Sequence, residues 1–272
     1  MGAYRLLPVY LVLGVTSVLI LAPLILTLFT AFKPALQIAE APWLPPNPPV
    51  LDNFQTAWVE GRFNIYFLNS VFISLVDVII MVPVASMAAY ALVFIRISGR
   101  KLLLLLFMAG LMVPPAGIIL PLYATVRDLG LVNSHLGVIL ADVALALPIF
   151  VFIMYAFFSK LPPELHDAAK VDGASELRTF WSVMLPMAKP AVVTVALLEF
   201  LFSWNDLLLR QVFLTTDSLR TLTVGLLFFQ GTMTRNVAGI TAAAVIMAIP
   251  IIILFLTFQR QFVRGMTEGA VK

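Results

Sequence analysis

Six long apolar segments constrain this chain more than any other feature of its sequence. A helix needs about 20 apolar residues to cross the roughly 30 Å hydrocarbon core of a bilayer, and a helix satisfies its own backbone hydrogen bonds in lipid. The composition agrees, because 61% of the residues are hydrophobic and only 11% are charged, against about 25% charged in soluble domains. We therefore predict an all-α polytopic membrane protein with six transmembrane helices, over about 9–32, 67–95, 102–125, 137–158, 191–210 and 238–259.

Lysine and arginine are concentrated on one side of these segments. If the N-terminus is cytoplasmic, eleven of the 17 basic residues fall in cytoplasmic stretches: Arg5, Arg96, Arg100, Lys101, Lys160, Lys170, Arg178, Lys189, Arg260, Arg264 and Lys272. Six fall outside: Lys33, Arg62, Arg127, Arg210, Arg220 and Arg235. Cytoplasmic loops of membrane proteins carry the excess of Lys and Arg. The sequence therefore predicts that both termini and the segment 159–190 are cytoplasmic.

The segment 159–190 carries the signals of two short helices. Pro162 and Pro163 suit a helix start, where a missing N–H costs nothing, and Gly173 suits the end of that helix because glycine adopts the left-handed conformation cheaply. Ser175 is placed to cap a second helix, which we expect to end at Pro186. The second helix carries a bulky apolar stripe formed by Leu177, Phe180, Trp181 and Met184. We expect an exposed, plug-like pair of helices.

The same segment keeps a specific spacing: Asp167-Ala168-Ala169, then Gly173, Val183 and Leu185-Pro186. This pattern resembles the cytoplasmic loop of ABC-importer permeases, in which Glu-Ala-Ala is followed at the same intervals by Gly, Ile and Leu-Pro. Asp167 and Val183 replace Glu and Ile here and keep the charge and the shape.

Further stretches extend the resemblance over nearly the whole chain. Ser203-Trp204-Asn205-Asp206 and the Gly-x-x-x-Gly-Ala-x-Lys ending, within the tail 260–272, are similar to carbohydrate-uptake permeases of the maltose-system type. Asn69-Ser70, Ala89-Tyr90-Ala91 and Arg100-Lys101 fit the same pattern. The resemblance implies one transmembrane domain over 1–272, folded as a type I ABC-importer permease bundle in a prokaryotic plasma (inner) membrane.

The resemblance also implies a function and its partners. The chain would import a sugar or oligosaccharide together with a second permease subunit, a cytoplasmic ATPase dimer and an extracytoplasmic substrate-binding protein. Coupling to the ATPase would run through the loop 164–186, with Ala168 and Ala169 against the ATPase groove. The residues assigned to coupling are Glu164, Asp167, Ala168, Ala169, Gly173, Val183, Leu185 and Pro186.

The chain has no means of hydrolysing ATP by itself. No nucleotide-binding glycine loop occurs, and the hydrophilic segments 33–66 and 159–190 are shorter than the roughly 50 residues of the smallest usual domains. We expect ATP and Mg²⁺ to be used by the partner ATPase, and no cofactor, catalytic residue or metal site in this chain. Its expected surroundings are lipid and protein partners, with no nucleic acid. The histidines His135 and His166 are interpreted as ordinary loop residues.

Ionisable residues within the apolar segments are the candidates for the substrate path. A carboxylate at the bilayer centre costs about 2.5–3.5 kcal/mol on insertion scales, so such groups face the bundle or a water-filled path. Asp206 also has the i,i+4 spacing for an ion pair with Arg210. Helix–helix hydrogen bonding and gating are the alternative roles for these acids, of which Asp77 is one. The assigned path residues are Asp142, Glu199, Asn205 and Asp206.

Other functions fit the composition less well. A stand-alone secondary transporter or channel for a polar solute is the main alternative, but we find no internal repeat that would favour it. An intramembrane enzyme lacks a nucleophile–base pair or a metal-ligand cluster in the sequence. Within the importer interpretation, glycerol phosphate or another polar solute remains an alternative substrate, and the second permease is either a different chain or a second copy.

Overall fold

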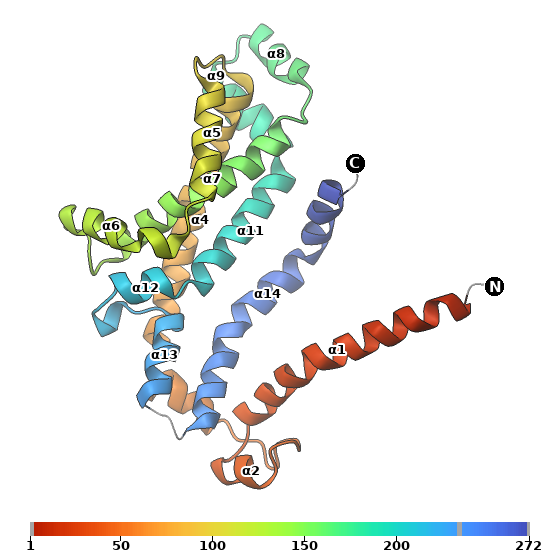
Figure 1. The fold of residues 1–272 in the computed structure, drawn as a ribbon, viewed down its shortest axis with the longest axis vertical. Helices are drawn as coiled ribbons and strands as arrows, with labels where there is room; N and C mark the ends of the chain where they lie inside the picture. The colour runs from red at the N-terminus through yellow and green to blue at the C-terminus, as the bar shows by residue number, and fades with distance from the viewer. Residues whose placement is uncertain (1–2, 233–235, 271–272) are drawn as a thin grey trace. The chain divides into compact units, whose positions relative to one another are not determined.

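The computed structural model describes residues 3–232 and 236–270, and the side chains of 8–231 and 236–259. Every regular element in these residues is helical (Figure 1), which confirms the all-α prediction. The long helices are α1 (Ala3–Ala31), α4 (Phe63–Phe94), α7 (His135–Phe158), α11 (Lys189–Asn205) and α14 (Val237–Ala270).

Four of the described helices, α1, α4, α7 and α14, are individually long and apolar enough to cross a membrane. Two bent pairs raise the number to six if each pair is one span. The first pair, α5 (Arg100–Leu111) and α6 (Pro115–Asp128), is bent by 106°. The expected span 102–125 is thus divided near Pro114, because two successive prolines lack N–H donors and restrict the preceding residue to extended conformations.

The second bent pair joins the loop to the following span. It comprises Glu176–Met187 and α11, which are bent by 82°. The short helices of the loop are α8 (Pro163–Val171), α9 (Glu176–Thr179) and α10 (Leu185–Met187), with π-helical turns over Phe180–Met184. The remaining short elements are α2 (Ala35–Glu40), α3 (Asp52–Gln55), a π-helix over Thr56–Glu60, α12 (Leu208–Phe213), a 3-10 turn over Asp217–Leu219 and α13 (Leu222–Thr232).

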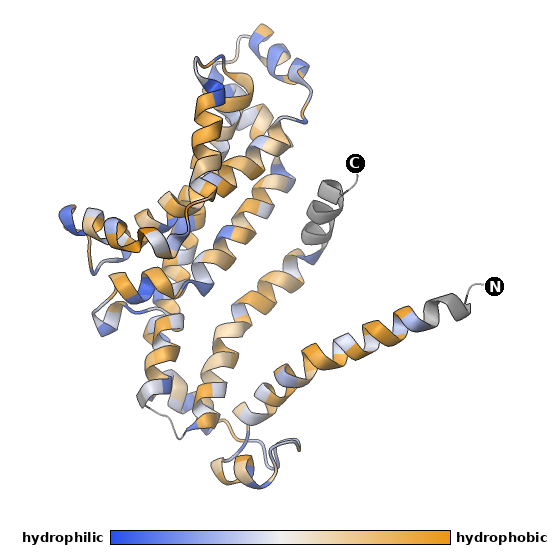
Figure 2. Cartoon of the chain, in the orientation of Figure 1, coloured by the Kyte–Doolittle hydropathy of each residue, from blue (hydrophilic) through white to orange (hydrophobic). Residues whose placement is uncertain are grey.

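The chain divides into two compact units. The first comprises Met1–Asn64 and Gly225–Pro250, and the second comprises Ile65–Val224 and Ile251–Lys272. In the second unit, α7 packs against both α5 and α11, and α8–α9 lie at the opposite end of these helices from α12 (Figure 1). Hydrophobic residues cover most of the helical surface of this unit, and α8 is more hydrophilic (Figure 2).

Helix α5 approaches α7 closely at Gly110. A Cβ added there would lie 2.9 Å from the ring of Pro148, which is too short for a carbon–carbon contact. From this contact toward the loop, one apolar core joins α4, α7 and the loop, with Met81, Phe150, Met154 and Phe180 fully or almost fully buried. This core fixes the loop to the membrane-spanning helices.

The predicted ends of the two loop helices are confirmed in atomic detail. Gly173 has a φ of +79°, its N–H donates to Lys170, and the N–H of Ala174 donates to Ala169. This pair of bonds is the Schellman motif that closes a helix with a left-handed residue. The Ser175 hydroxyl accepts from the N–H of Arg178 and caps α9. Pro186 lies inside α10 rather than at its end, and the helix stops at Met187.

The tail motif lies largely beyond the described side chains. The backbone of α14 continues to Ala270, so the last span and most of the tail form one helix. The side chains of the Gly-x-x-x-Gly-Ala-x-Lys ending lie outside the described residues, as do Arg5, Arg235 and the tail cations of the orientation argument.

Candidate functional site

A buried arginine lies at the centre of a cluster of acidic residues in the second unit. The Arg210 side chain is 1% exposed and forms an ion pair with Asp142 of α7 through Nη1. Its Nη2 lies 3.6 Å from Asp77 of α4, and its Nη1 lies 3.6 Å from Asp206. The predicted i,i+4 pair of Asp206 with Arg210 is therefore present, and the cluster holds three carboxyl groups around one guanidinium.

Ser203 links the arginine to α4. The Ser203 hydroxyl donates to Asp77 at 2.6 Å and accepts from Nη2 of Arg210 at 2.8 Å. The Ser74 hydroxyl lies 3.0 Å from the same oxygen, and Arg210 also donates to the Ser203 carbonyl at 3.0 Å. Hydrogen bonds to charged groups strengthen in a low dielectric. This network therefore joins α4, α7, α11 and α12 and fixes their relative positions more specifically than apolar contacts would.

The chain turns at Asp206 so that Arg210 can reach the cluster. Helix α11 ends at Asn205, and Asp206 is extended, with φ −66° and ψ 127°. The Asp206 carboxylate then accepts from the backbone N–H groups of Leu209 and Arg210, at 3.1 and 3.2 Å. The Asp206 carboxylate thus accepts hydrogen bonds from the first turn of α12 and also offsets part of the positive charge of Arg210.

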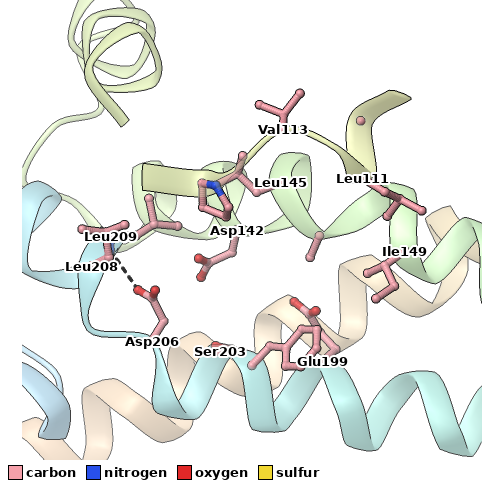
Figure 3. Close-up of a pocket in the computed structure, with 14 residues that line it drawn as sticks. Leu111, Val113, Asp142, Leu145, Ile149, Glu199, Ser203, Asp206, Leu208 and Leu209 are labelled. Carbon is pink, nitrogen blue, oxygen red and sulfur yellow. Dashed lines mark hydrogen bonds between the residues drawn. The ribbon is translucent and has the colours of Figure 1, made fainter. Parts of the chain in front are cut away.

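A pocket of about 290 Å³ opens beside this cluster. Residues of α5, α6, α7, α11 and α12 and of two connecting segments line it, and Asp142, Glu199 and Asp206 supply its acidic groups. Figure 3 shows Asp142 pointing from α7 toward the side that carries Glu199 and Asp206. The pocket lies within one unit of the chain, and its other lining residues are mostly apolar: Gly110, Leu111, Val113, Pro115, Leu145, Ala146, Ile149, Phe202, Ser203, Leu208 and Leu209.

The structure brings three of the four predicted path residues together. Asp142, Glu199 and Asp206 line the pocket, whereas Asn205 is exposed and donates to the carbonyl of Leu201 on its own helix. Sequence reasoning did not assign Arg210 or Ser203 to the site. The spacing from Asp206 to Arg210 was the available signal, but burial of the arginine depends on the turn after α11.

The loop presents a mixed surface to solvent. Its exposed apolar side chains are Val171 at 88%, Leu177 at 66% and Trp181 at 48%, and the exposed coupling candidates are Glu164, Asp167, Ala168, Gly173 and Pro186. Ala169 is buried and Leu165 packs inward, which differs from the expectation that both alanines form one outward face. Successive helical residues are about 100° apart, so neighbouring alanines need not share a surface.

The bulky stripe of the second loop helix is also divided. Phe180 and Met184 are buried in the core, and Val183 and Leu185 pack against it. The π-helical turns precede Pro186, which has no N–H for the bond to the fourth residue before it. Four loop residues therefore anchor the loop, while Leu177 and Trp181 remain outside.

Glu176 connects the loop to α4 and lies outside the spacing motif. It accepts from Lys170 at 2.8 Å and from the Tyr90 hydroxyl at 2.7 Å. His166 lies 3.3 Å away through Nε2 and stacks on Phe94 at 5.2 Å, so it is a packed residue rather than an ordinary loop histidine. Hydrogen bonds from Lys170, and next from Tyr90, lower the pKa of Glu176 from 4.5 to about 2.

Comparison with known proteins gives the family. The family described as the binding-protein-dependent transport system inner membrane component matches residues 81–268. The diacetylchitobiose uptake system permease protein NgcG of Streptomyces coelicolor is 33% identical over 94% of this chain and 85% of its own length. The trehalose transport system permease protein SugB of Mycobacterium tuberculosis is 34% identical over 93% of this chain and 92% of its own length.

A solved structure has the same fold. One chain of a bacterial ABC transporter involved in the import of the acidic polysaccharide alginate superposes with a TM-score of 0.85 at 23% identity, covering 96% of this chain and 98% of that chain. The chain is a multi-pass inner-membrane protein, and it belongs to the carbohydrate-uptake branch of the binding-protein-dependent ABC-importer permeases.

Proposed function

We propose that this chain is one transmembrane subunit of an ATP-driven importer for a sugar or oligosaccharide. It works with a second permease subunit, a cytoplasmic ATPase dimer that uses ATP and Mg²⁺, and an extracytoplasmic binding protein. The observation that carries the proposal is the loop 164–186, which is rigidly anchored on one side and exposes apolar side chains on the other. Relatives named for diacetylchitobiose and trehalose uptake support a carbohydrate as the solute.

Force from the ATPase enters through the outward face of the loop. Val171, Leu177 and Trp181 provide apolar contact area for a groove on the ATPase, as a short amphipathic helix does in other helix-in-groove complexes. Glu164 and Asp167 meet charges at the rim of that groove. Ala169, Val183 and Leu185 hold the loop from inside, so they act by positioning the contact surface.

The solute path includes the pocket beside Arg210. Asp142, Glu199 and Asp206 reach it from two helices and a connecting segment, and carboxylate oxygens accept hydrogen bonds from sugar hydroxyls. Asn205, which does not line the pocket and donates to the carbonyl of Leu201, would join the path only after α11 rotates. Rocking of α7 against α11 during the ATPase cycle would open and close this space.

Purification from the native membrane tests the assembly. Tagged protein isolated in mild detergent is expected to retain an ATPase and a second permease, and vesicles containing this complex and its binding protein are expected to take up sugar only with ATP. Isolation of this chain alone, with uptake that follows a proton or sodium gradient, would contradict the proposal and favour a secondary transporter.

The variant Gly173→Val tests coupling through the loop. A side chain in the left-handed conformation costs about 1–2 kcal/mol, and apart from the two neighbouring residues no atom lies within 4 Å of an added Cβ. We expect the variant to assemble but to lose most ATP-driven uptake, because the angle between α8 and α9 changes. Uptake equal to that of the unmodified protein would show that the turn at Gly173 is not needed for coupling.

A further inference from the structure

Glu199 is a buried carboxyl group with an unused hydrogen-bonding atom. The residue is 1% exposed, and its Oε2 has no hydrogen-bond partner among the described residues. It lines the pocket between α7 and α11, and Figure 3 shows its carboxyl group on the pocket side of α11. A buried polar group without a partner destabilises the fold, so this side chain has a cost that nothing in the described structure offsets.

The remaining polar groups of the pocket accept hydrogen bonds rather than donate them. Asp142 and Asp206 contribute carboxylate oxygens, and the Ser203 hydroxyl directs its proton to Asp77. No lysine, arginine or histidine is found among the described residues that line the pocket. Arg210 lies behind this lining and is already engaged by Asp142 and Ser203.

The charge around the pocket is unbalanced. Three aspartates surround the single guanidinium of Arg210, so negative groups outnumber positive ones without counting Glu199. An anionic solute would therefore meet repulsion and find no free cationic donor. A solute that carries hydroxyl groups would find an acceptor without a partner in Oε2 of Glu199.

We propose that Glu199 accepts a hydrogen bond from a hydroxyl group of the transported solute, and that this pocket admits uncharged, hydroxyl-rich solutes while rejecting anions. The inference rests on the proposed importer function and specifies its substrate class. It favours a neutral sugar over sugar phosphates, uronates and glycerol phosphate.

The variant Glu199→Leu separates a solute contact from a structural role. Replacing an unpartnered buried carboxyl by an apolar side chain of similar size removes an unsatisfied group, so the melting temperature of the purified complex is expected to stay equal or rise. ATP-driven uptake of neutral sugars is expected to fall at least tenfold, and Glu199→Gln, which keeps one acceptor oxygen, should retain an intermediate rate. Glu40→Leu is the matched control, because it makes the same substitution at an exposed glutamate of α2 that does not line the pocket.

The charge of the pocket can be measured directly because the chain contains no cysteine. A cysteine placed by Ala146→Cys in the pocket is treated with cationic and anionic methanethiosulfonate reagents in the assembled complex. The reference is Leu129→Cys, at a side chain that is 64% exposed. The measured quantity is the rate of modification by the cationic reagent divided by that by the anionic reagent. One net negative charge at about 10 Å in water should raise this ratio about fourfold over the reference.

The outcomes distinguish the inference from the function on which it rests. Absence of ATP-driven uptake by the unmodified complex would reject the proposed function. If that complex transports but Glu199→Leu keeps the uptake of every sugar carried, or lowers the melting temperature, Glu199 is not the contact residue. A rate ratio at position 146 equal to that at 129, or ATP-driven uptake of trehalose 6-phosphate as fast as of trehalose, would overturn the selection against anions.

Discussion

Arg210 is a buried cation held between helices that are far apart in sequence. Its partners Asp77, Asp142 and Asp206 come from α4, α7 and the α11–α12 connection. Isolated charges are expensive inside a membrane protein, and removing one partner of a buried pair leaves the others uncompensated. The single positive charge of Arg210 therefore offsets the cost of burying three neighbouring carboxyl groups, and not of one alone.

Substitution of the arginine should destabilise the fold strongly. Arg210→Met is expected to cost about 3–5 kcal/mol and to lower the melting temperature of the purified complex by at least about 6 °C, or to prevent its accumulation. Arg210→Lys keeps the charge and should show a smaller loss. Arg127→Met is the matched control, because Arg127 pairs with Asp128 at 2.9 Å but is 63% exposed, and exposed pairs contribute about 0–1 kcal/mol. Equal melting temperatures for the two Met variants would contradict this account.

At the scale of elements, α8 and α9 are joined by side-chain contacts to the end of α4 that carries Tyr90. The Glu176 carboxylate accepts hydrogen bonds from Lys170 of α8 and from Tyr90 of α4. We call these three residues the Glu176 hub. The hub stiffens the loop relative to α4, so that a force on the outward face of the loop moves α4 instead of bending the loop. The contact is 43% exposed at Glu176, which limits its energetic contribution.

This hub should weaken in acid. The pKa of Glu176 is lowered to about 2 from 4.5, so its contribution to stability is present above about pH 4.5 and is lost as the pH falls toward 2. Hydrogen exchange of α8 is expected to speed up between pH 5 and 3, after correction for intrinsic rates. In Glu176→Gln the exchange should already be faster at pH 6 and should change less with pH. An α8 that exchanges identically in both proteins would show that the hub does not anchor the loop.

The ends of these helices were easier to predict from the sequence than the side of each helix that faces the protein interior. Gly173 and Ser175 act through their own backbone and the next few residues, so the ends of α8 and α9 were predictable. The inward orientation of Ala169 depends on how α8 packs against the π-helical turns over Phe180–Met184 and against α9, which no short spacing encodes. The burial of Arg210 similarly depends on the break at Asp206, and the prolines near 114 indicated a kink without giving its 106°.

At the scale of the whole molecule, the distribution of Lys and Arg residues indicates which segments face the cytoplasm. Two of the basic residues assigned to the outside, Lys33 and Arg210, are buried at 0% and 1% exposure. Lys33 donates to the carbonyls of Ala41 and Pro42, at 3.0 and 2.7 Å. Neither is a free loop charge of the kind that the positive-inside rule counts. Leaving them out increases the bias toward cytoplasmic termini and a cytoplasmic loop 159–190.

Labelling of single cysteines in intact cells tests this orientation. Lys160→Cys lies at an exposed position between α7 and α8, and Leu129→Cys follows α6 at 64% exposure. The parent chain has no cysteine and provides the unlabelled control. A membrane-impermeant maleimide is expected to label position 129 in intact cells and to label position 160 only after permeabilisation. Because both termini share the side of the loop if six spans are formed, the reverse pattern would place the loop outside, away from ATP, and would contradict both the orientation and the proposed coupling.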